Sequence, residues 1–580
     1  MEMIFSLILP LQPQSALKNI RKTVYKNLSY ILWTFLRLSF IPSMTSESPL
    51  LAEDACSIVQ HLPTEIVLAF GQYLDGCTLV TALQVCREWN GILQAYVWRA
   101  ISKKQWHHLR FPLVHIQCLD TDDSRYLLPK LLFVRHIEWW SNRALTATPH
   151  MNRKAFSARK QITLQSLNQL LSKTPSLESL SLGTFIYSPY PSLDPLVTAM
   201  MQLHQLKQLN IAVWSAPDES VAFHKLFPIL SRLEELVLRG SWYKVDDRQI
   251  TQDNEAWPRM RTLKIQRRAM MIVGNCINLT ELDLGCNEDR HEYKSPVSLL
   301  PLLACPKLEK LKLDGYSRES CWVDVAQTLG TLGGLKSLDL TAWTEDHYEF
   351  LNASPDYRWQ QHCHDGQARN GAGTEQGGLP LPLLEHLRVC LVATDSTGAR
   401  ECMHNVLQTR PRLKTFVVYG THFYIGDLFA RPGMGHEGGW ACKDLEVLRF
   451  ELSNGIYRRK EAEECRLWQT VYRQLGQLHR LKHLYIRAFH LRKGRESGVE
   501  ALAPEGRLSE LQNVVLSDGA GAEWSRSQIQ DLVGMMPKLK YLQLKPLERR
   551  EFLRIKGYLK EIGREDIDLE TRRWSERCES

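Results

Sequence analysis

The sequence lacks the spacing signals that mark most metal sites and disulfide scaffolds. Its 14 cysteines include no C-x-x-C pair, so we expect reduced thiols in a cytoplasmic or nuclear protein. The G-x-S-x-G pattern of hydrolases and the lysine of a phosphate-binding loop are also missing. The formal net charge is only +8 over 580 residues, which gives little support to nucleic-acid binding.

Two short segments contain residue types found in catalytic or metal sites, but neither has the rest of such a site. The run His362-Cys363-His364-Asp365 offers metal ligands without the second half that a four-ligand zinc site needs. Glycines between 371 and 378 have the composition of a phosphate loop, but no strand pattern leads into them. We therefore expect no catalytic residue, no metal, no cofactor and no enzyme activity.

Long hydrophobic runs are missing as well. Residues 3–11 and 28–41 are apolar, but both runs are shorter than the roughly 20 residues that span a bilayer, and Arg37 interrupts the second. Basic residues follow the first run, which is the wrong order for a signal peptide. We expect residues 1–54 to be a disordered leader or a mis-assigned start, with translation beginning at Met44. A basic membrane-surface anchor or transit-like leader is the alternative.

The stretch from Leu62 to Trp98 has the pattern of three short helices. Its apolar residues recur three and four positions apart, which is the spacing of one helical face. Pro63 suits a first helical turn, Asp75-Gly76 ends that helix, and Thr78 can cap the next one. So small a unit cannot enclose all its large side chains, so another part of the chain or a partner must cover them.

This stretch resembles an F-box, and we assign residues 55–106 to it. The run from Val85 to Trp89 (Val-Cys-Arg-Glu-Trp), followed by Trp98, is the most specific part of the resemblance. The resemblance implies docking on a Skp-type adaptor, which is held by a cullin ubiquitin ligase. The residues that it implies for the adaptor contact are Leu62, Pro63, Ile66, Leu74, Val85, Cys86 and Trp89. Trp98 is expected to pack under the first repeat instead.

From Leu177 onward an apolar-x-x-apolar-x-apolar pattern recurs thirteen times, mostly at intervals of 27 to 32 residues. An earlier segment, residues 134–137, is expected to form a first strand. The final alternation in each copy predicts a short strand with one buried face, and the residues before it are helix-like. Repeated units of this kind stack their strands in parallel, with the helices on the outer face.

The pattern resembles a leucine-rich repeat array, which gives an α/β solenoid over residues 107–545 behind a small all-α F-box. The copies lack the Asn or Cys that many such repeats carry after the third leucine. Glycine-rich insertions are expected at 343–382 and 419–440, where loops project and often bind. Residues 546–580 are expected to form a polar C-terminal cap.

Side chains that flank the last two apolar positions of each copy are expected on the concave strand face. Toward the far end these include arginines and tyrosines, which are favoured at recognition sites. The candidate substrate-binding residues are Arg388, Tyr419, Arg449, Tyr485 and Arg487. We hypothesise that they bind an acidic or phosphorylated protein segment.

Together the two resemblances imply a non-catalytic substrate receptor of a Skp–cullin–F-box ubiquitin ligase. Its partners would be a Skp-type adaptor, a cullin reached through it, and an unidentified protein substrate. Nucleic acid is not expected as a partner, and a membrane only if the leader is a real anchor. The alternative is a leucine-rich repeat scaffold that joins proteins outside a ligase.

Overall fold

The computed structural model describes residues 64–71, 82–83, 87–101, 128–140, 167–185, 194–214, 221–239, 243–244, 256–265, 267–285, 297–314, 322–323, 325–343, 381–391, 403, 405–420, 440–452, 474–487, 508–517, 526–534, 536–545 and 549–569. The leader expected over residues 1–54 and nearly all of both expected insertions lie outside them. Residue contacts divide the chain into two compact units. The first comprises Met1–Val221, Lys225–Arg232 and Ser241–Lys244, and the second comprises Ala222–His224, Leu233–Gly240 and Val245–Ser580.

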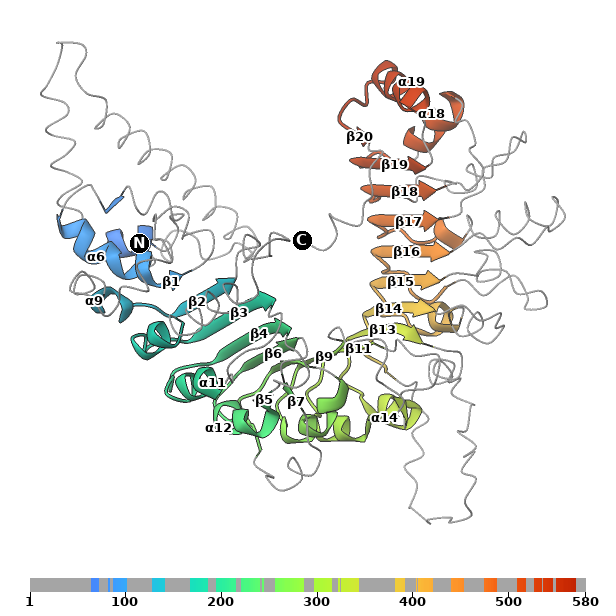
Figure 1. Ribbon diagram of the computed structural model, residues 1–580. Coiled ribbons are helices and arrows are strands. Elements are labelled where there is room, and N and C mark those ends of the chain that lie inside the picture. The colour runs from blue at the N-terminus through green and yellow to red at the C-terminus, as the bar shows by residue number, and fades with distance from the viewer. Residues whose placement is uncertain are drawn as a thin grey trace, which may run out of the picture. The chain divides into compact units, whose positions relative to one another are not determined.

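The first unit begins with helices and continues as a parallel sheet (Figure 1). Its helices are α4 (Thr64–Gly71), α6 (Arg87–Trp98), α9 (Leu128–Leu131), α11 (Asp194–Met201) and α12 (Phe227–Leu230). Its sheet has the order β1 (Ala100–Ile101), β2 (His136–Trp140), β3 (Ser179–Phe185) and β4 (Gln208–Trp214). The short elements β5 (Val221–Ala222), η4 (Phe223–Leu226) and β7 (Tyr243–Lys244) lie in the sequence where the two units alternate.

One strand precedes the segment that the sequence predicts as the first. The predicted segment at residues 134–137 becomes β2, but β1 comes earlier and pairs with it in parallel, Ala100 opposite His136. The prediction missed β1 because two residues are too few to show an alternating pattern. The sheet therefore begins inside the range that was assigned to the F-box.

The second unit continues the same architecture through parallel strands stacked one beside another (Figure 1). In sheet order they are β6 (Glu235–Arg239), β8 (Thr262–Lys264), β9 (Glu281–Leu284), β11 (Lys310–Asp314), β13 (Ser337–Trp343), β14 (His386–Leu391), β15 (Thr415–Gly420), β16 (Val447–Leu452), β17 (His483–Arg487), β18 (Asn513–Ser517), β19 (Tyr541–Lys545) and β20 (Asp568–Leu569). A separate pair consists of β10 (Val297–Ser298) and β12 (Trp322–Val323). Each of the thirteen predicted copies forms one strand, so the predicted parallel solenoid is confirmed.

The repeated leucine keeps one register from strand to strand. Leu338 lies opposite Leu311 on one side and Leu387 on the other, and Phe416 and Leu448 continue the line. All five side chains are at most 2% exposed. Burying one such side chain stabilises a fold by roughly 1.5–3 kcal/mol, so the aligned apolar positions form the main stabilising layer.

The outer segments are less helical than the repeat pattern predicts. The second unit contains α14 (Val325–Thr331), α18 (Arg526–Gly534) and α19 (Arg549–Glu561), but η5 (Arg267–Asn275) and η6 (Leu300–Ala304) are 3-10 helices. Only 19 residues separate Leu263 of β8 from Leu282 of β9. A 3-10 helix rises about 2.0 Å per residue and an α-helix about 1.5 Å. A 3-10 helix therefore covers the same length with fewer residues, which suits a short repeat.

The C-terminal tail contributes both a helix and a strand. After α19, residues 568–569 form β20, which pairs in parallel with β19, Leu569 opposite Leu542. The sequence predicts only a polar helical cap there, because two residues show no strand pattern. The tail therefore closes the sheet edge with its own short strand as well as with α19.

An alternation of charge lies at the residue just before each strand from β11 to β17. In strand order these residues are Glu309, Lys336, Glu385, Lys414, Glu446 and Lys482. Each lysine forms an ion pair with the glutamate before it, at 2.7, 2.6 and 2.8 Å along the series. If a strand paired with the strand after its proper neighbour, two glutamates or two lysines would lie side by side and repel. The alternation therefore favours pairing with the correct neighbouring strand.

Replacing Glu385 and Glu446 by glutamine is expected to destabilise the protein slightly at neutral pH and less in acid. A hydrogen bond from Lys414 lowers the pKa of Glu385 below its usual 4.5, and one from Lys482 lowers the pKa of Glu446. A lowered carboxylate pKa stabilises the fold above pH 4.5, and this stabilisation is lost as the pH falls through the folded-state pKa. Both pairs are partly exposed to solvent, which screens them, so each should contribute about 0.2–1 kcal/mol. Urea denaturation at pH 7 and pH 3 measures the difference in free energy of unfolding between the two proteins, and a difference that does not decrease at pH 3 contradicts this origin.

Candidate interaction surfaces

The structure describes only part of the predicted adaptor contact. Ile66 lies within α4 and Trp89 lies within α6, while the other five residues are outside the described part of the chain. Trp89 is 1% exposed. The structure therefore supports an internal packing role for this side chain, and a direct contact with the adaptor stays a prediction.

Helix α6 is amphipathic and packs against α4. Glu88 in its first turn complements the helix dipole, and its buried face is formed by Trp89, Leu93, Val97 and Trp98. A Cβ atom on Gly71 of α4 would meet Leu93 Cδ2 at 2.8 Å. The absence of a side chain at Gly71 therefore lets the two helices approach closely.

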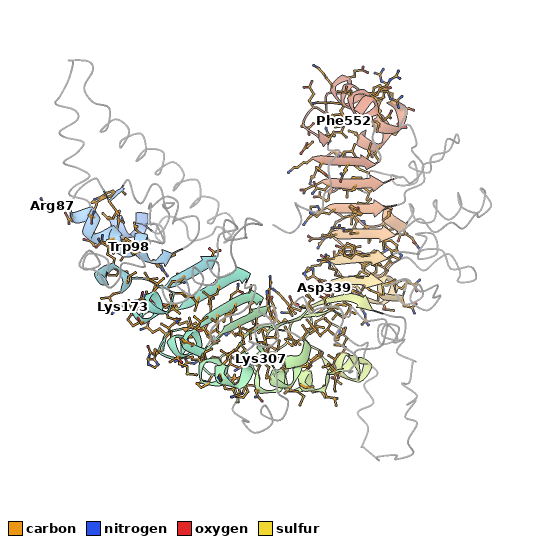
Figure 2. All side chains as sticks on the ribbon, in the orientation of Figure 1. Arg87, Trp98, Lys173, Lys307, Asp339 and Phe552 are labelled. Atoms are coloured by element: carbon orange, nitrogen blue, oxygen red, sulfur yellow. The ribbon has the colours of Figure 1, made fainter. Side chains whose placement is uncertain are left out.

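The end of α6 is fixed directly to the repeat sheet. The carbonyl of Arg99 accepts hydrogen bonds from the backbone N–H groups of Arg135 and His136, at 2.7 and 3.0 Å. Trp98, labelled in Figure 2, is 9% exposed, and Lys130 Nζ lies 5.5 Å from its ring centroid. The expectation that Trp98 packs at the start of the repeats is consistent with this placement.

Two apolar side chains remain exposed beside this junction. Leu132 is 53% exposed and Phe133 is 41% exposed, immediately after α9. Helix α9 packs on α6, so these side chains extend the surface around the end of that helix. Sequence analysis did not single them out, because they stand within the apolar run 131–134, whose pattern does not show which side chains are exposed.

The second candidate surface is the open face of the sheet, which is the face opposite the buried leucines. Its middle row follows one register position through successive strands. In order the row contains Lys264, Asp283, Lys312, Asp339, Arg388, Val417, Arg449, Tyr485 and Val515. Charge alternates in sign as far as Arg388, and the alternation stops at Val417. Figure 2 labels Asp339, which lies on β13 in the alternating part of the row.

Four predicted substrate-binding residues form one cluster on strands β14 to β17. The guanidinium carbon of Arg388 lies 4.9 Å from the ring centroid of Tyr419, and Arg388 Nη2 donates a hydrogen bond to the Tyr419 hydroxyl at 2.9 Å. The guanidinium carbon of Arg449 lies 5.0 Å from the Tyr419 centroid and 4.7 Å from the Tyr485 centroid. The fifth candidate, Arg487, lies on β17, and its side chain is outside the described part of the structure.

An acidic region borders this cluster. Asp339 Oδ2 lies 3.9 Å from Arg388 Nη1, and Asp283 Oδ2 lies 3.6 Å from Lys312 Nζ. Burial raises the pKa of Asp339, and burial likewise raises the pKa of Asp314 on the neighbouring strand. Cationic and anionic side chains thus lie next to one another on this part of the open face.

The described residues give no support for metal chemistry or a membrane span. No group of three His, Cys, Asp or Glu side chains that could hold a metal occurs among them, and His362–Asp365 is outside them. Burial raises the pKa of the Cys305 and Cys442 thiols to about 12, which disfavours reactive thiolates. In this part of the chain, every helix is too short or too polar to cross a bilayer.

Comparison with known proteins identifies the helical region. Residues 59–104 match the family model of F-box-like domains, so the chain carries an F-box-like domain that includes α4, α6 and β1. The leucine register and the parallel sheet make the remainder a leucine-rich repeat solenoid. None of the curated proteins compared with the chain matches it.

Two solved structures resemble the chain over most of its length, but at low similarity. The leucine-rich repeat-containing protein LegL7 from Legionella pneumophila shares 13% identity, with 76% of this chain and 95% of that chain covered and a TM-score of 0.23. A chain from the yeast Rad7 and Elc1 complex also shares 13% identity, with coverages of 81% and 98% and a TM-score of 0.27. The repeat assignment rests on the chain's own register, because similarity at this level carries no argument.

Proposed function

We propose that this protein is the substrate-recognition subunit of a Skp–cullin–F-box ubiquitin ligase. The match of residues 59–104 to F-box-like domains, in a chain that continues as a leucine-rich repeat solenoid, carries the proposal. The F-box-like domain would dock on a Skp-type adaptor, and the repeats would hold a protein substrate. Leu132 and Phe133 provide additional exposed apolar surface beside α6 for that docking.

Such a subunit accelerates ubiquitin transfer without forming or breaking a bond itself. Holding the substrate in the same assembly as a charged ubiquitin carrier raises its effective concentration there. The hydrogen bonds between the Arg99 carbonyl and the β2 region support this role, because they attach the end of α6 to the first strands. We place the protein in the cytoplasm or nucleus, where Cys276, Cys305, Cys390 and Cys442 would remain free thiols.

The proposal is tested by replacing Leu62 and Pro63 together with alanine. Both residues belong to the motif that the family resemblance assigns to the adaptor contact. Loss of the two apolar side chains from the proposed contact should weaken co-purification with the Skp-type adaptor by about tenfold or more. Unfolding of the repeats, followed by circular dichroism, should be unchanged.

The chain contains a matched control for this experiment. Leu300 and Pro301 form another Leu-Pro pair at the start of η6, and Leu300 is 42% exposed. Replacing this pair with alanine should leave adaptor binding intact. Equal adaptor capture by both double variants would reject the docking proposal. Capture of the adaptor without any cullin would favour a scaffold outside the ligase.

A further inference from the structure

The four residues Arg388, Tyr419, Arg449 and Tyr485 form what we call the Arg–Tyr cluster. Tyr419 lies near both guanidinium groups, at 4.9 and 5.0 Å from its centroid, and Tyr485 lies 4.7 Å from that of Arg449. Rings at these distances attract a cation electrostatically. The arrangement therefore holds two flexible arginine side chains in place before any ligand binds, which reduces the entropy lost on binding.

The geometry of the cluster suits an extended acidic ligand. Arg388 and Arg449 occupy the same row on β14 and β16, so their backbones are separated by two strand spacings, roughly 9.5 Å. Between them lies Val417, which is 8% exposed and presents no charge. A guanidinium group can hold a carboxylate or phosphate through two parallel N–H donors. Two anionic groups of one extended segment could therefore bind together.

The surroundings limit the size of this cationic region. The Asp339 carboxylate lies 3.9 Å from Arg388 on one side, and the next strands on the other side place Val515 and Gln543 in the row. A nucleic acid needs a longer series of phosphate contacts to bind tightly. Among the described residues, the two arginines are separated by the apolar Val417 and bordered by Asp339, which is more suitable for a short protein segment.

We propose that the Arg–Tyr cluster binds an acidic segment of a partner protein, with carboxylate or phosphate groups held by Arg388 and Arg449. The tyrosine rings fix the guanidinium groups and provide apolar contact for the segment between its charges. This inference rests on the proposed function in one respect, since the segment would belong to the substrate. The binding site itself can be tested without an adaptor or a ligase.

The experiment measures binding of fluorescein-labelled peptides to the full chain by anisotropy. The probes are a hexaglutamate peptide, a peptide of equal length with three phosphoserines, and hexaglutamine. We expect both acidic peptides to bind and hexaglutamine not to bind. Arg388→Gln with Arg449→Gln should weaken binding of the acidic peptides by about tenfold or more. Each variant removes a hydrogen bond between charged groups, and the loss of one such bond is enough to change Kd by about tenfold. Tighter binding of the phosphopeptide identifies phosphate as the preferred group, and tighter binding of hexaglutamate identifies carboxylate.

A matched double variant separates this site from the overall charge. Lys443 and Arg480 are exposed cations in the same unit, and they bond to Gln477 and Asp444 instead of to the cluster. Lys443→Gln with Arg480→Gln changes the net charge equally and should leave peptide binding unchanged. Equal losses in the two double variants would overturn the proposal.

Two further measurements complete the test. Tyr419→Leu with Tyr485→Leu keeps the charge but removes the rings, and should weaken peptide binding without lowering the melting temperature. A single-stranded oligonucleotide of equal charge should bind less tightly than the peptides, and tighter binding would overturn the choice of a protein ligand. Failure of peptide binding would leave the Leu62 and Pro63 experiment unaffected, so the two proposals can fail separately.

Discussion

Replacing Phe416 with alanine is expected to lower the free energy of unfolding of the surrounding repeats by about 3–5 kcal/mol. Phe416 is fully buried on β15 and packs edge-on against Phe450 of β16, with ring centroids 5.8 Å apart and planes at 74°. The smaller side chain loses the apolar burial and the ring contact, and it leaves a cavity between adjacent repeats. Hydrogen exchange of individual segments measures the effect.

The position of the loss should be as informative as its size. In a repeat array each unit contacts chiefly its neighbours, so protection should fall most on β14 to β17. Thr415→Ala changes the preceding residue of the same strand, where the side chain is only partly buried, and should have a small effect. A uniform loss of protection over the whole second unit would show that these repeats unfold as one cooperative block.

Trp89→Ala should have the second large effect, by disrupting the packing of the F-box-like domain. Trp89 is 1% exposed on α6, on the same helical face as Leu93 and Val97. Truncating a buried tryptophan lowers the free energy of unfolding by about 3–5 kcal/mol. A helical unit this small has only marginal stability, so we expect it to unfold. Adaptor binding should therefore be lost together with hydrogen-exchange protection of α4 and α6.

An osmolyte distinguishes this indirect effect from loss of a contact. Trimethylamine N-oxide favours folded states, so it should restore adaptor binding to Trp89→Ala. The Leu62 and Pro63 double variant, which we expect to remain folded, should not recover. Trp89→Phe retains an aromatic ring and should bind nearly normally. If the osmolyte restores protection of α6 but not adaptor binding, Trp89 itself contacts the adaptor.

The sequence predicts the repeat strands well because their signal is local and repeated. Leu338, Leu387 and Leu448 each lie in an apolar-x-apolar alternation, and burial of one strand face is enough to fix that pattern. The strands β1 and β20 contain two residues each, so only their pairing with β2 and β19 defines them. The 3-10 helix η5 escaped prediction because it spans an unusually short repeat, a constraint that its local sequence does not show.

The candidate binding residues were predictable in position but not in arrangement. Alternation along a strand places Arg388 and Arg449 on the open face. Which tyrosine each arginine contacts depends on the register between strands and on side-chain rotamers, neither of which is encoded within one repeat. The sequence also could not show that Trp89 faces the interior, because three short helices can enclose only some of their apolar side chains.

The paired glutamates and lysines before the strands also constrain how the array can change in length. Removing a single repeat between Glu309 and Lys482 would join two glutamates or two lysines across neighbouring strands. Removing two consecutive repeats would preserve the order of opposite charges. Gene duplications or deletions in this region, whether natural or engineered, should therefore be tolerated best in multiples of two repeats.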